Sequence, residues 1–233
     1  MSESTFVVET RALGREYRIG GASIKALADV SIAVGRGEFV SIMGPSGSGK
    51  STLLNLLGGL DAPTSGSVIL EGTELSLLDE RHLAAIRRKK LGFVFQRHDL
   101  LPALTVAENL EFPLILDEVP EADRRIRIAA LLEKVGLADK AESLPEELSG
   151  GQQQRVGIAR ALVNGPDIIL ADEPTGNLDS KTSAAIMDFL SSLCRESGKT
   201  LIVVTHDPLV ASRADRTLHF QDGVQVVGQG EQS

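Results

Sequence analysis

The sequence has little cysteine, no long apolar run and no excess of positive charge, and each shortage excludes a class of protein. The one cysteine, Cys194, cannot form an internal disulfide and lies in a helical pattern, which favours an inert thiol over a redox site. No apolar run approaches the roughly 20 residues that a membrane-spanning helix requires. The longest runs, such as 201–204, have the length of a strand. The sequence therefore predicts neither an internal disulfide nor a membrane span.

The net charge and the first residues indicate the compartment and the kind of partner that we expect. Residues 1–4 show neither the basic region nor the apolar stretch of a secretory signal peptide, so we expect the chain to stay in the cytoplasm. The formal net charge of -8 argues against binding to a nucleic-acid backbone, which needs a basic face, although it allows a local basic patch. The content of 42% hydrophobic and 24% charged residues is typical of a globular protein, and the length of 233 residues indicates one large domain or two small ones.

The most informative stretch is 44–52, which reads GPSGSGKST and fits the P-loop pattern G-x-x-x-x-G-K-[ST]. A buried strand over 39–43 precedes it, and a helix over 51–57 follows with its N-terminus facing the loop. Glycines let backbone N–H groups point inward at a triphosphate, while Lys50 would neutralise its β- and γ-phosphates and Ser51 would hold Mg²⁺. The alternative is a surface turn with a chance lysine. The predicted phosphate-binding residues are Gly44, Pro45, Ser46, Gly47, Ser48, Gly49, Lys50, Ser51 and Thr52.

A second half-site follows the apolar run 168–171, which ends in the carboxylates Asp172 and Glu173. This order of residues is the Walker B arrangement. Neighbouring side chains of a strand point to opposite faces, so the two acids should have different roles. Asp172 is predicted to coordinate Mg²⁺ and Glu173 to polarise an attacking water. The competing interpretation is a pair of acids that end a strand at the surface.

The remaining pattern is that of an α/β protein. Alternating segments within the first 70 residues, with a turn over 62–66, predict an antiparallel β layer attached to a parallel core. Two apolar strands joined by a helix over about 181–197 form the βαβ unit of a buried parallel sheet. A hairpin over 217–227 precedes a tail, 228–233, that looks frayed.

Between the two halves of the sheet lies a helical block. From Thr105 to Asn164 the apolar residues recur with helical spacing, and Pro113 and Pro120 punctuate the block. It is therefore a candidate helical subdomain inserted into the sheet. Before this block, a predicted helix over 79–90 ends in four cations. We interpret them as a solvated helix end that complements the helix dipole, with a partner contact as the alternative.

The residues 148–152 read LSGGQ, a full match to the signature of ATP-binding-cassette (ABC) ATPases, and nearly the whole chain resembles this family. The hydroxyl of Ser149 and the backbone N–H groups of the next two residues open a helix and can cradle a γ-phosphate. In this family the signature contacts ATP held by the opposite subunit. The resemblance therefore implies two copies that sandwich two nucleotides head to tail. The signature residues assigned to the nucleotide are Ser149, Gly150, Gly151 and Gln152.

Other family motifs follow in order. Tyr17, the only tyrosine, stands where the family places an aromatic ring that stacks on adenine, although a lone tyrosine is more often ordinary packing. Gln96 matches the Q-loop, which reaches Mg²⁺ and the water while its loop faces the transport partner. His206 matches the switch histidine that senses the γ-phosphate. These resemblances imply catalytic roles for Glu173, His206 and Gln96.

The D-loop departs from the commoner family form. Asp179 matches the residue that would link the two nucleotide sites across the dimer and so belongs to the predicted binding set. The usual Ser-Ala before Leu-Asp is replaced here by Gly176 and Asn177, which leaves the cross-dimer contacts of Asn177 open.

The resemblance implies an α/β P-loop NTPase core with a parallel sheet, an antiparallel β subdomain and an inserted helical subdomain. One ABC ATPase domain would fill 1–233, with the RecA-like core and β layer in 1–97 and 166–233 and the helical subdomain in 98–165. The cofactors would be ATP and Mg²⁺, and the activity ATP hydrolysis coupled to transport. The partners would be a second copy and an integral membrane permease contacted near Gln96 to Leu104, including Arg97 and Asp99. The chain would then lie on the inner face of the cell membrane.

Within the family, the sequences of these motifs resemble those of the subgroup that serves lipoprotein release and macrolide efflux. Two alternatives stay open. The chain could belong to a membrane-bound complex in which ATP gates a signalling or cell-wall enzyme, or to a soluble ABC ATPase without a transport role. The soluble relatives usually carry two cassettes, long coiled-coil insertions or zinc-binding insertions, which this sequence lacks.

Overall fold

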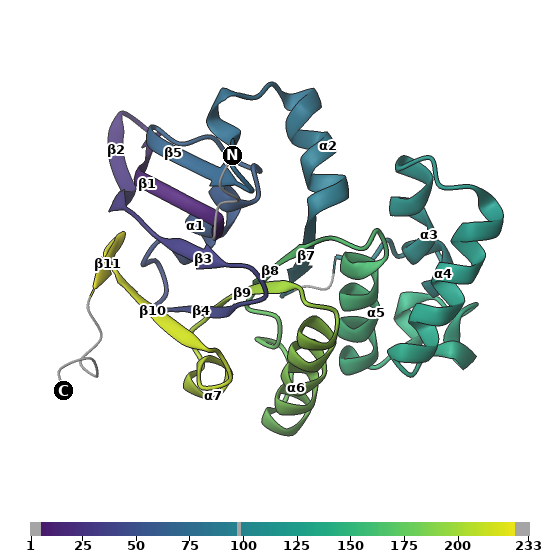
Figure 1. The fold of residues 1–233 in the computed structure, drawn as a ribbon. Helices are drawn as coiled ribbons and strands as arrows, with labels where there is room; N and C mark the ends of the chain where they lie inside the picture. Colours follow the sequence, from purple (N-terminus) through teal and green to yellow (C-terminus); the bar gives the residue numbers. More distant parts are fainter. Residues whose placement is uncertain (1–5, 97–98, 227–233) are drawn as a thin grey trace.

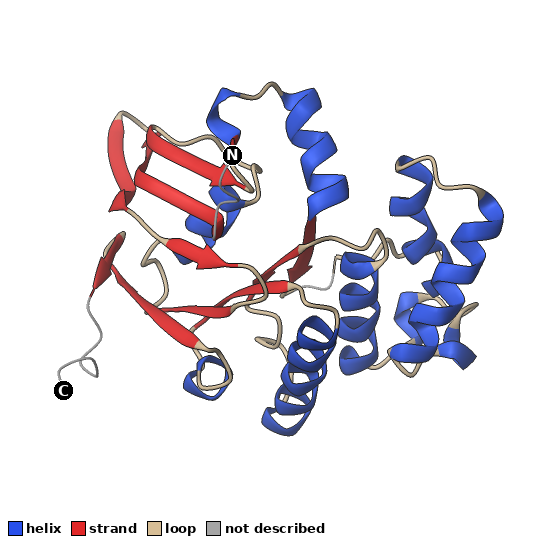
Figure 2. Cartoon of the chain, viewed as in Figure 1, coloured by secondary structure: helices blue, strands red, loops and turns tan. Residues whose placement is uncertain are grey.

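A computed structural model describes residues 6–96 and 99–226 (Figures 1 and 2). In this part of the chain the larger sheet has six strands in the order β11-β10-β4-β9-β8-β7. The five strands from β10 to β7 run parallel, and β11 pairs antiparallel with β10. The bounds are β4 Phe39–Met43, β7 Leu91–Phe95, β8 Ile168–Asp172, β9 Thr200–Thr205, β10 Arg216–Gln221 and β11 Val224–Val226.

The smaller sheet is the antiparallel layer that the sequence predicts. The long strand β1 pairs antiparallel with β2, β3 and β5, and β5 pairs with β6. β5 begins at Ser65, so the last two residues of the predicted turn over 62–66 are already strand. The bounds are β1 Phe6–Ile19, β2 Ala22–Val30, β3 Ala33–Gly35, β5 Ser65–Leu70 and β6 Thr73–Glu74.

Helices cover both faces of the larger sheet (Figure 1). The α-helices are α1 Lys50–Leu57, α2 Glu80–Lys90, α3 Val106–Leu116, α4 Glu121–Lys134, α5 Gly150–Leu162, α6 Ser180–Glu196 and α7 Pro208–Ala211. The 3₁₀ turns are η1 Leu75–Leu77, η2 Ala138–Lys140 and η3 Pro145–Glu147. The α/β prediction with an antiparallel layer is therefore confirmed.

Strand β9 shows how the core forms, because its six residues are all buried. Ile202 and Val204 pack in a cluster with α1 and the antiparallel layer. Leu201 and Val203 point the other way and pack with α5 and α6. A strand buried on both faces favours apolar residues along its middle, which explains the continuous run 201–204 between Thr200 and Thr205.

The helical block has a core of its own. Val106, Leu110 and Leu114 of α3 pack against Ile128 and Leu132 of α4, as their spacing predicts. Helix α5 belongs to two cores, because some of its side chains pack in this cluster and others against the sheet. The boundaries of the domains at 97/98 and 165/166 therefore stay a prediction.

Two local interpretations of the helical elements need correction. Pro113 lies inside α3, whose first turn is fixed by a capping box between Thr105 and Glu108. The basic end of α2 is not simply solvated, because Lys90 forms ion pairs with Glu71 and Asp167 at 2.9 and 3.2 Å. Arg87 pairs with Glu80 of the same helix and donates to the carbonyl of Gly59, and Arg88 donates to that of Leu116.

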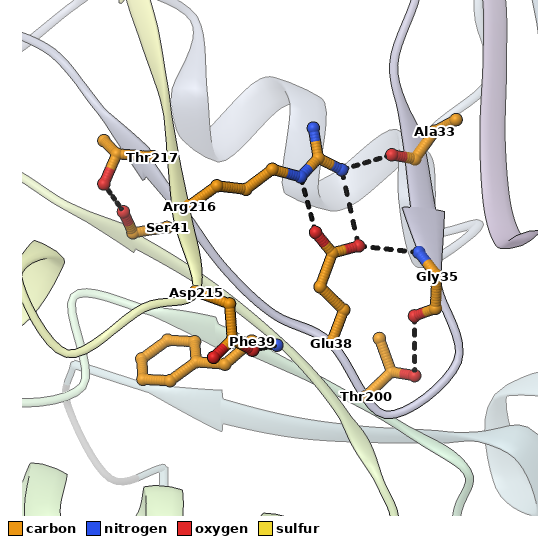
Figure 3. A network of polar contacts seen from close by, with 9 residues as sticks. All are labelled: Ala33, Gly35, Glu38, Phe39, Ser41, Thr200, Asp215, Arg216 and Thr217. Atoms are coloured by element: carbon orange, nitrogen blue, oxygen red, sulfur yellow. Dashed lines mark hydrogen bonds and ion pairs between the residues drawn. The ribbon is translucent and has the colours of Figure 1, made fainter. Parts of the chain in front are cut away.

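A polar network ties the amino-terminal ends of β4, β9 and β10 together (Figure 3). Glu38 accepts hydrogen bonds from Arg216 and, at 2.7 Å, from the backbone of Gly35. Asp215 accepts from the backbone of Phe39 at 2.8 Å. Burial raises the pKa of Glu38, but the hydrogen bonds from Arg216 and Gly35 outweigh it and hold the pKa below its ordinary value of 4.5. This network lies at the edge of the sheet opposite the P-loop.

Replacing Glu38 by glutamine should lower the free energy of unfolding at neutral pH by about 1 kcal/mol, because the charge-assisted contacts are lost at a partly exposed site. A carboxylate with a lowered pKa stabilises the fold above its ordinary pKa, and this contribution disappears as the pH falls through 4.5 and below. Denaturant unfolding of both chains over this range checks the prediction. A difference that stayed constant down to about pH 3 would contradict it.

Candidate functional site

The loop between β4 and α1 has the geometry of a phosphate cradle. Gly49 adopts φ 93°, a conformation that favours glycine, and a Cβ there would lie 2.4 Å from the carbonyl oxygen of Ala26. A Cβ on Gly44 would lie 2.1 Å from the carbonyl oxygen of Phe220. Both positions therefore exclude larger residues. The hydroxyl of Ser48 is buried and has no hydrogen-bond partner within the described residues, as expected of a group that awaits a ligand.

The Lys50 side chain folds back across this loop. Its ammonium donates to the carbonyl oxygens of Gly44 and Pro45, each at 2.8 Å, and the residue is 6% exposed. Both acceptors are uncharged, so an anionic phosphate would be a stronger partner than either. Lys50 also begins α1, whose N-terminal N–H groups attract anions. The structure therefore places a cation and the N-terminus of a helix at one point.

The second half-site lies beside the loop at the carboxyl edge of β8. The hydroxyl of Ser51 donates to the Asp172 carboxylate at 3.1 Å, so the two residues predicted to hold Mg²⁺ lie together. Burial raises the pKa of Asp172, and the nearby Glu173 charge adds to the rise, whereas the hydrogen bond from Ser51 and the charge of Lys50 oppose it. A bound cation would relieve this cost by pairing with the carboxylate.

No three carboxylate, imidazole or thiolate groups gather into a metal site within the described residues. The contact between Ser51 and Asp172 fits Mg²⁺, which proteins usually hold through one or two side chains together with phosphate oxygens and water. Ser51 and Asp172 supply the oxygen ligands of that kind.

Glu173 and His206 form a pair at the same edge. Nδ1 of His206 lies 2.7 Å from Oε1 of Glu173, and the backbone N–H of Glu173 donates to the carbonyl of Val204 on the neighbouring strand. Glu173 adopts φ 45°, which is uncommon for a residue with a side chain and turns it away from the strand direction. The side chain of Glu173 is 17% exposed and that of His206 is 63% exposed. The partly exposed Glu173 carboxylate can therefore contact a water molecule, and the His206 imidazole faces solvent.

The signature residues open α5. Ser149 caps the helix by accepting from the backbone of Gln152, and Gln152 returns a contact to the backbone of Ser149 at 2.9 Å. A Cβ on Gly151 would lie 2.9 Å from Thr182 of α6, so this glycine allows the two helices to approach closely. A surface cavity of about 530 Å³ lies beside the signature, and none of its lining residues comes from the P-loop.

Asp179 has a local role in the single chain. Its carboxylate caps α6 by accepting from the backbones of Lys181 and Thr182, each at 3.1 Å. The hydrogen bonds from Thr182 hold the pKa of Asp179 below its ordinary value. The cross-dimer link of Asp179 stays a prediction.

Asn177 contacts Gln96, a contact that the sequence does not reveal. Nδ2 of Asn177 donates to the backbone carbonyl of Gln96 at 3.1 Å. Oδ1 of Asn177 therefore points toward the Gln96 side chain and accepts from its Nε2 at 3.4 Å. A Cβ on Gly176 would lie 2.6 Å from the same Nε2. Gln96 directly follows Phe95, which pairs with Asp172. The unusual Gly-Asn of the D-loop therefore holds Gln96 beside the carboxylate edge.

We expect Asn177→Ala to lower ATP turnover about threefold to tenfold, since it removes hydrogen bonds that orient Gln96. Gly176→Ala should have a similar effect because its methyl group displaces the Gln96 amide. In a Gln96→Ala chain neither change should reduce turnover further, since contacting residues are not additive. Steady-state ATPase assays on the single and double variants check this, and full additivity would contradict it.

Tyr17 is held by a residue that the sequence analysis did not single out. Its hydroxyl donates to Asp61 at 2.8 Å. Asp61 follows α1, and 44 positions separate the two residues, so no periodic pattern points to the contact. The structure thus brings together Lys50, Ser51, Asp172, Glu173 and His206, whereas Tyr17 lies on β1 and the signature opens α5.

A glycine-rich loop between a buried parallel strand and a helix, with a carboxylate at the end of a nearby strand, defines a P-loop nucleotide-binding protein. A family model described as "ABC transporter" matches residues 27–176. The chain belongs to this ABC transporter family, as an ABC ATPase domain with the fold that the sequence predicts.

Similar proteins include two groups of different length. A macrolide export ATP-binding/permease protein MacB of Rhodopseudomonas palustris is 52% identical over 94% of this chain, which spans 33% of that protein. The lipoprotein-releasing system ATP-binding protein LolD of Pseudomonas fluorescens is 49% identical over 96% of this chain and 98% of its own length. The chain thus spans about a third of the length of its MacB relatives.

A solved structure has the same fold. It is the dimeric ATP-binding cassette MJ0796 in a post-hydrolysis state bound to ADP and Pi. Its TM-score is 0.86 and its sequence is 48% identical, with 94% of this chain and 96% of the other covered.

Proposed function

We propose that this chain binds and hydrolyses ATP as the nucleotide-binding subunit of a membrane transport complex of the lipoprotein-release or macrolide-export type. The observation that carries this proposal is the meeting of the P-loop with the Ser51–Asp172 and Glu173–His206 pairs at one edge of the sheet. The relatives named for macrolide export and lipoprotein release support the type of complex.

In this proposal each residue of the edge has a separate role. The loop amides and Lys50 bind the phosphates, and Ser51, Asp172 and Gln96 hold Mg²⁺, which neutralises charge on the phosphates when bound. Glu173 accepts the proton of the attacking water, and His206, which contacts the Glu173 carboxylate, senses the γ-phosphate. Tyr17 stacks on the adenine.

A second copy of the chain completes each site. Ser149, Gly150, Gly151 and Gln152 of one copy contact the γ-phosphate held by the other, and Asp179 links the two sites. ADP lacks the γ-phosphate, so ATP alone has a higher affinity for the closed pair, and hydrolysis reopens it. The dimeric form of MJ0796 supports the pairing of two copies.

We assign the permease contact to the segment from Gln96 to Leu104, of which residues 97 and 98 lie outside the described part. Leu101 supports the assignment, because it is 38% exposed and both its backbone groups bond to the buried Asn109 of α3. Next to it, α3 exposes the apolar side chains of Phe112, Ile115 and Leu116. Across 6–96 and 99–226, none of the helices combines the length and apolar composition that crossing a bilayer needs. A cytoplasmic position on the inner face of the membrane, through such a partner, is part of the proposal.

The test is purification of a tagged Glu173→Gln chain with MgATP from detergent-solubilised membranes, followed by mass spectrometry. A co-purifying permease would support the transport role, and charge reversal at Arg97 and Asp99 should then abolish the association. A co-purifying cell-wall or signalling enzyme would favour the gating alternative. Recovery of only the homodimer, ribosomes or nucleic acid would favour the soluble class.

A further inference from the structure

The Asp61 carboxylate holds Tyr17 and its neighbour Arg15. Oδ2 accepts from the Tyr17 hydroxyl at 2.8 Å and from Nε of Arg15 at 2.9 Å. Oδ1 accepts from Nη2 of Arg15 at 2.7 Å and from the backbone of Ala62 at 2.8 Å. A carboxylate has about four acceptor sites, and here all are occupied. The forked contact from Arg15 is the geometry that gives a guanidinium its strongest pairing.

Arg15 also covers one face of the tyrosine ring. Its guanidinium carbon lies 4.6 Å from the centroid of the Tyr17 ring, within the range of a cation–π contact. The ring is therefore fixed by its hydroxyl at the edge and by a cation on one face. Tyr17 is only half-buried, so part of its surface remains open to a ligand.

Backbone hydrogen bonds connect the loop that carries Asp61 to the helix that follows the P-loop. The backbone N–H of Asp61 lies 3.4 Å from the carbonyl of Asn55 in α1, the helix that Lys50 begins. Three residues further on, the backbone of Thr64 donates to the carbonyl of Gly14 in β1 at 2.8 Å. The loop that carries Asp61 is thus attached both to the helix of the P-loop and to the strand of Tyr17.

We propose that Asp61 and Arg15 are positioning residues for the base of the nucleotide: they hold the Tyr17 ring at a fixed distance from the P-loop, with one face covered and one presented for stacking. This inference rests on the proposed role of Tyr17 in stacking on adenine. A ring already ordered before binding loses less conformational entropy when the base arrives, so the pair raises affinity for the base and leaves phosphate binding unchanged.

The experiment compares two ligands on the same chains by titration calorimetry with Mg²⁺. ATP has a base, whereas inorganic tripolyphosphate has only the phosphates. All chains carry Glu173→Gln to prevent hydrolysis. Tyr17→Ala, Asp61→Asn and Arg15→Gln are the test variants. The matched control is Arg11→Gln, an arginine on the same strand that is exposed and pairs with Glu9.

We expect Tyr17→Ala to weaken ATP binding about tenfold, in line with the loss of one aromatic stacking contact. Asp61→Asn and Arg15→Gln should each weaken ATP binding about threefold to tenfold, since each removes charge-assisted hydrogen bonds that order the ring. Tripolyphosphate affinity should stay unchanged in all three, and Arg11→Gln should change neither ligand. In a Tyr17→Ala chain, Asp61→Asn should have no further effect on ATP affinity.

Tyrosine emission gives a second readout, because the chain has one tyrosine and no tryptophan. Asp61→Asn should change this emission before any nucleotide is added. In a chain that keeps Tyr17, Asp61 and Arg15, ATP should alter the emission and tripolyphosphate should not.

Each other outcome overturns the proposal in a distinct way. If Tyr17→Ala weakens ATP binding but the other two variants do not, the positioning role is wrong and the stacking role stands. If Tyr17→Ala has no effect, the stacking role itself is wrong. If Arg15→Gln strengthens ATP binding, Arg15 competes with the base for the ring. Equal losses for ATP and tripolyphosphate would mean that the variants only damage the fold.

Discussion

Glu173→Gln is expected to lower the turnover of ATP by about a hundredfold to ten-thousandfold, the range for loss of a general base. The amide keeps the size of the side chain and can still hydrogen-bond, but it accepts a proton poorly. Affinity for ATP should be retained because the P-loop, Lys50 and Asp172 are unchanged. Steady-state hydrolysis and equilibrium ATP binding on the same preparation measure the two effects.

The matched control is Glu196→Gln, which makes the same chemical change at an exposed position at the end of α6. It should leave turnover and affinity as they are. Wild-type turnover in the Glu173→Gln chain would refute the general-base assignment. A loss of ATP affinity as large as the loss of turnover would place Glu173 in binding.

Lys50→Ala should weaken ATP binding about tenfold to a hundredfold, because a buried charge-assisted contact to the phosphates is lost. The ammonium is buried against two carbonyl oxygens of its own loop, so no other cation can take its place without moving the loop. Calorimetry with MgATP checks the value. The chain should remain folded, as thermal unfolding can establish.

Lys25→Ala is the corresponding control, since Lys25 is exposed on β2. It should bind MgATP as the unaltered chain does. Normal MgATP affinity in Lys50→Ala would show that the P-loop role of Lys50 is wrong.

Much of the site could be predicted from the sequence because its parts are local. The P-loop spans nine consecutive residues, and strand β8 ends at the acids that the pattern indicates. Strand and helix periods also predicted β9 and α6 closely, since buried strands and amphipathic helices impose regular spacing of apolar residues.

The contacts that were missed join residues far apart in the chain. Tyr17 and Asp61 are 44 positions apart, and Gln96 and Asn177 are 81 apart. Side chains of this kind follow no period, and only the tertiary fold brings them together. The cations at the end of α2 were misinterpreted for the same reason, because the acids that pair with Lys90 lie on other elements.

The central claim is that two copies close on ATP, with the P-loop of one facing the signature of the other. Sedimentation of the Glu173→Gln chain with MgATP, with MgADP and without nucleotide tests this claim most directly. We predict a species of twice the chain mass with MgATP, and only the single chain with MgADP or without nucleotide. Adding Ser149→Arg should abolish the larger species, since the larger side chain blocks the signature. A monomer under all three conditions, or a dimer that forms equally without ATP, would contradict the account.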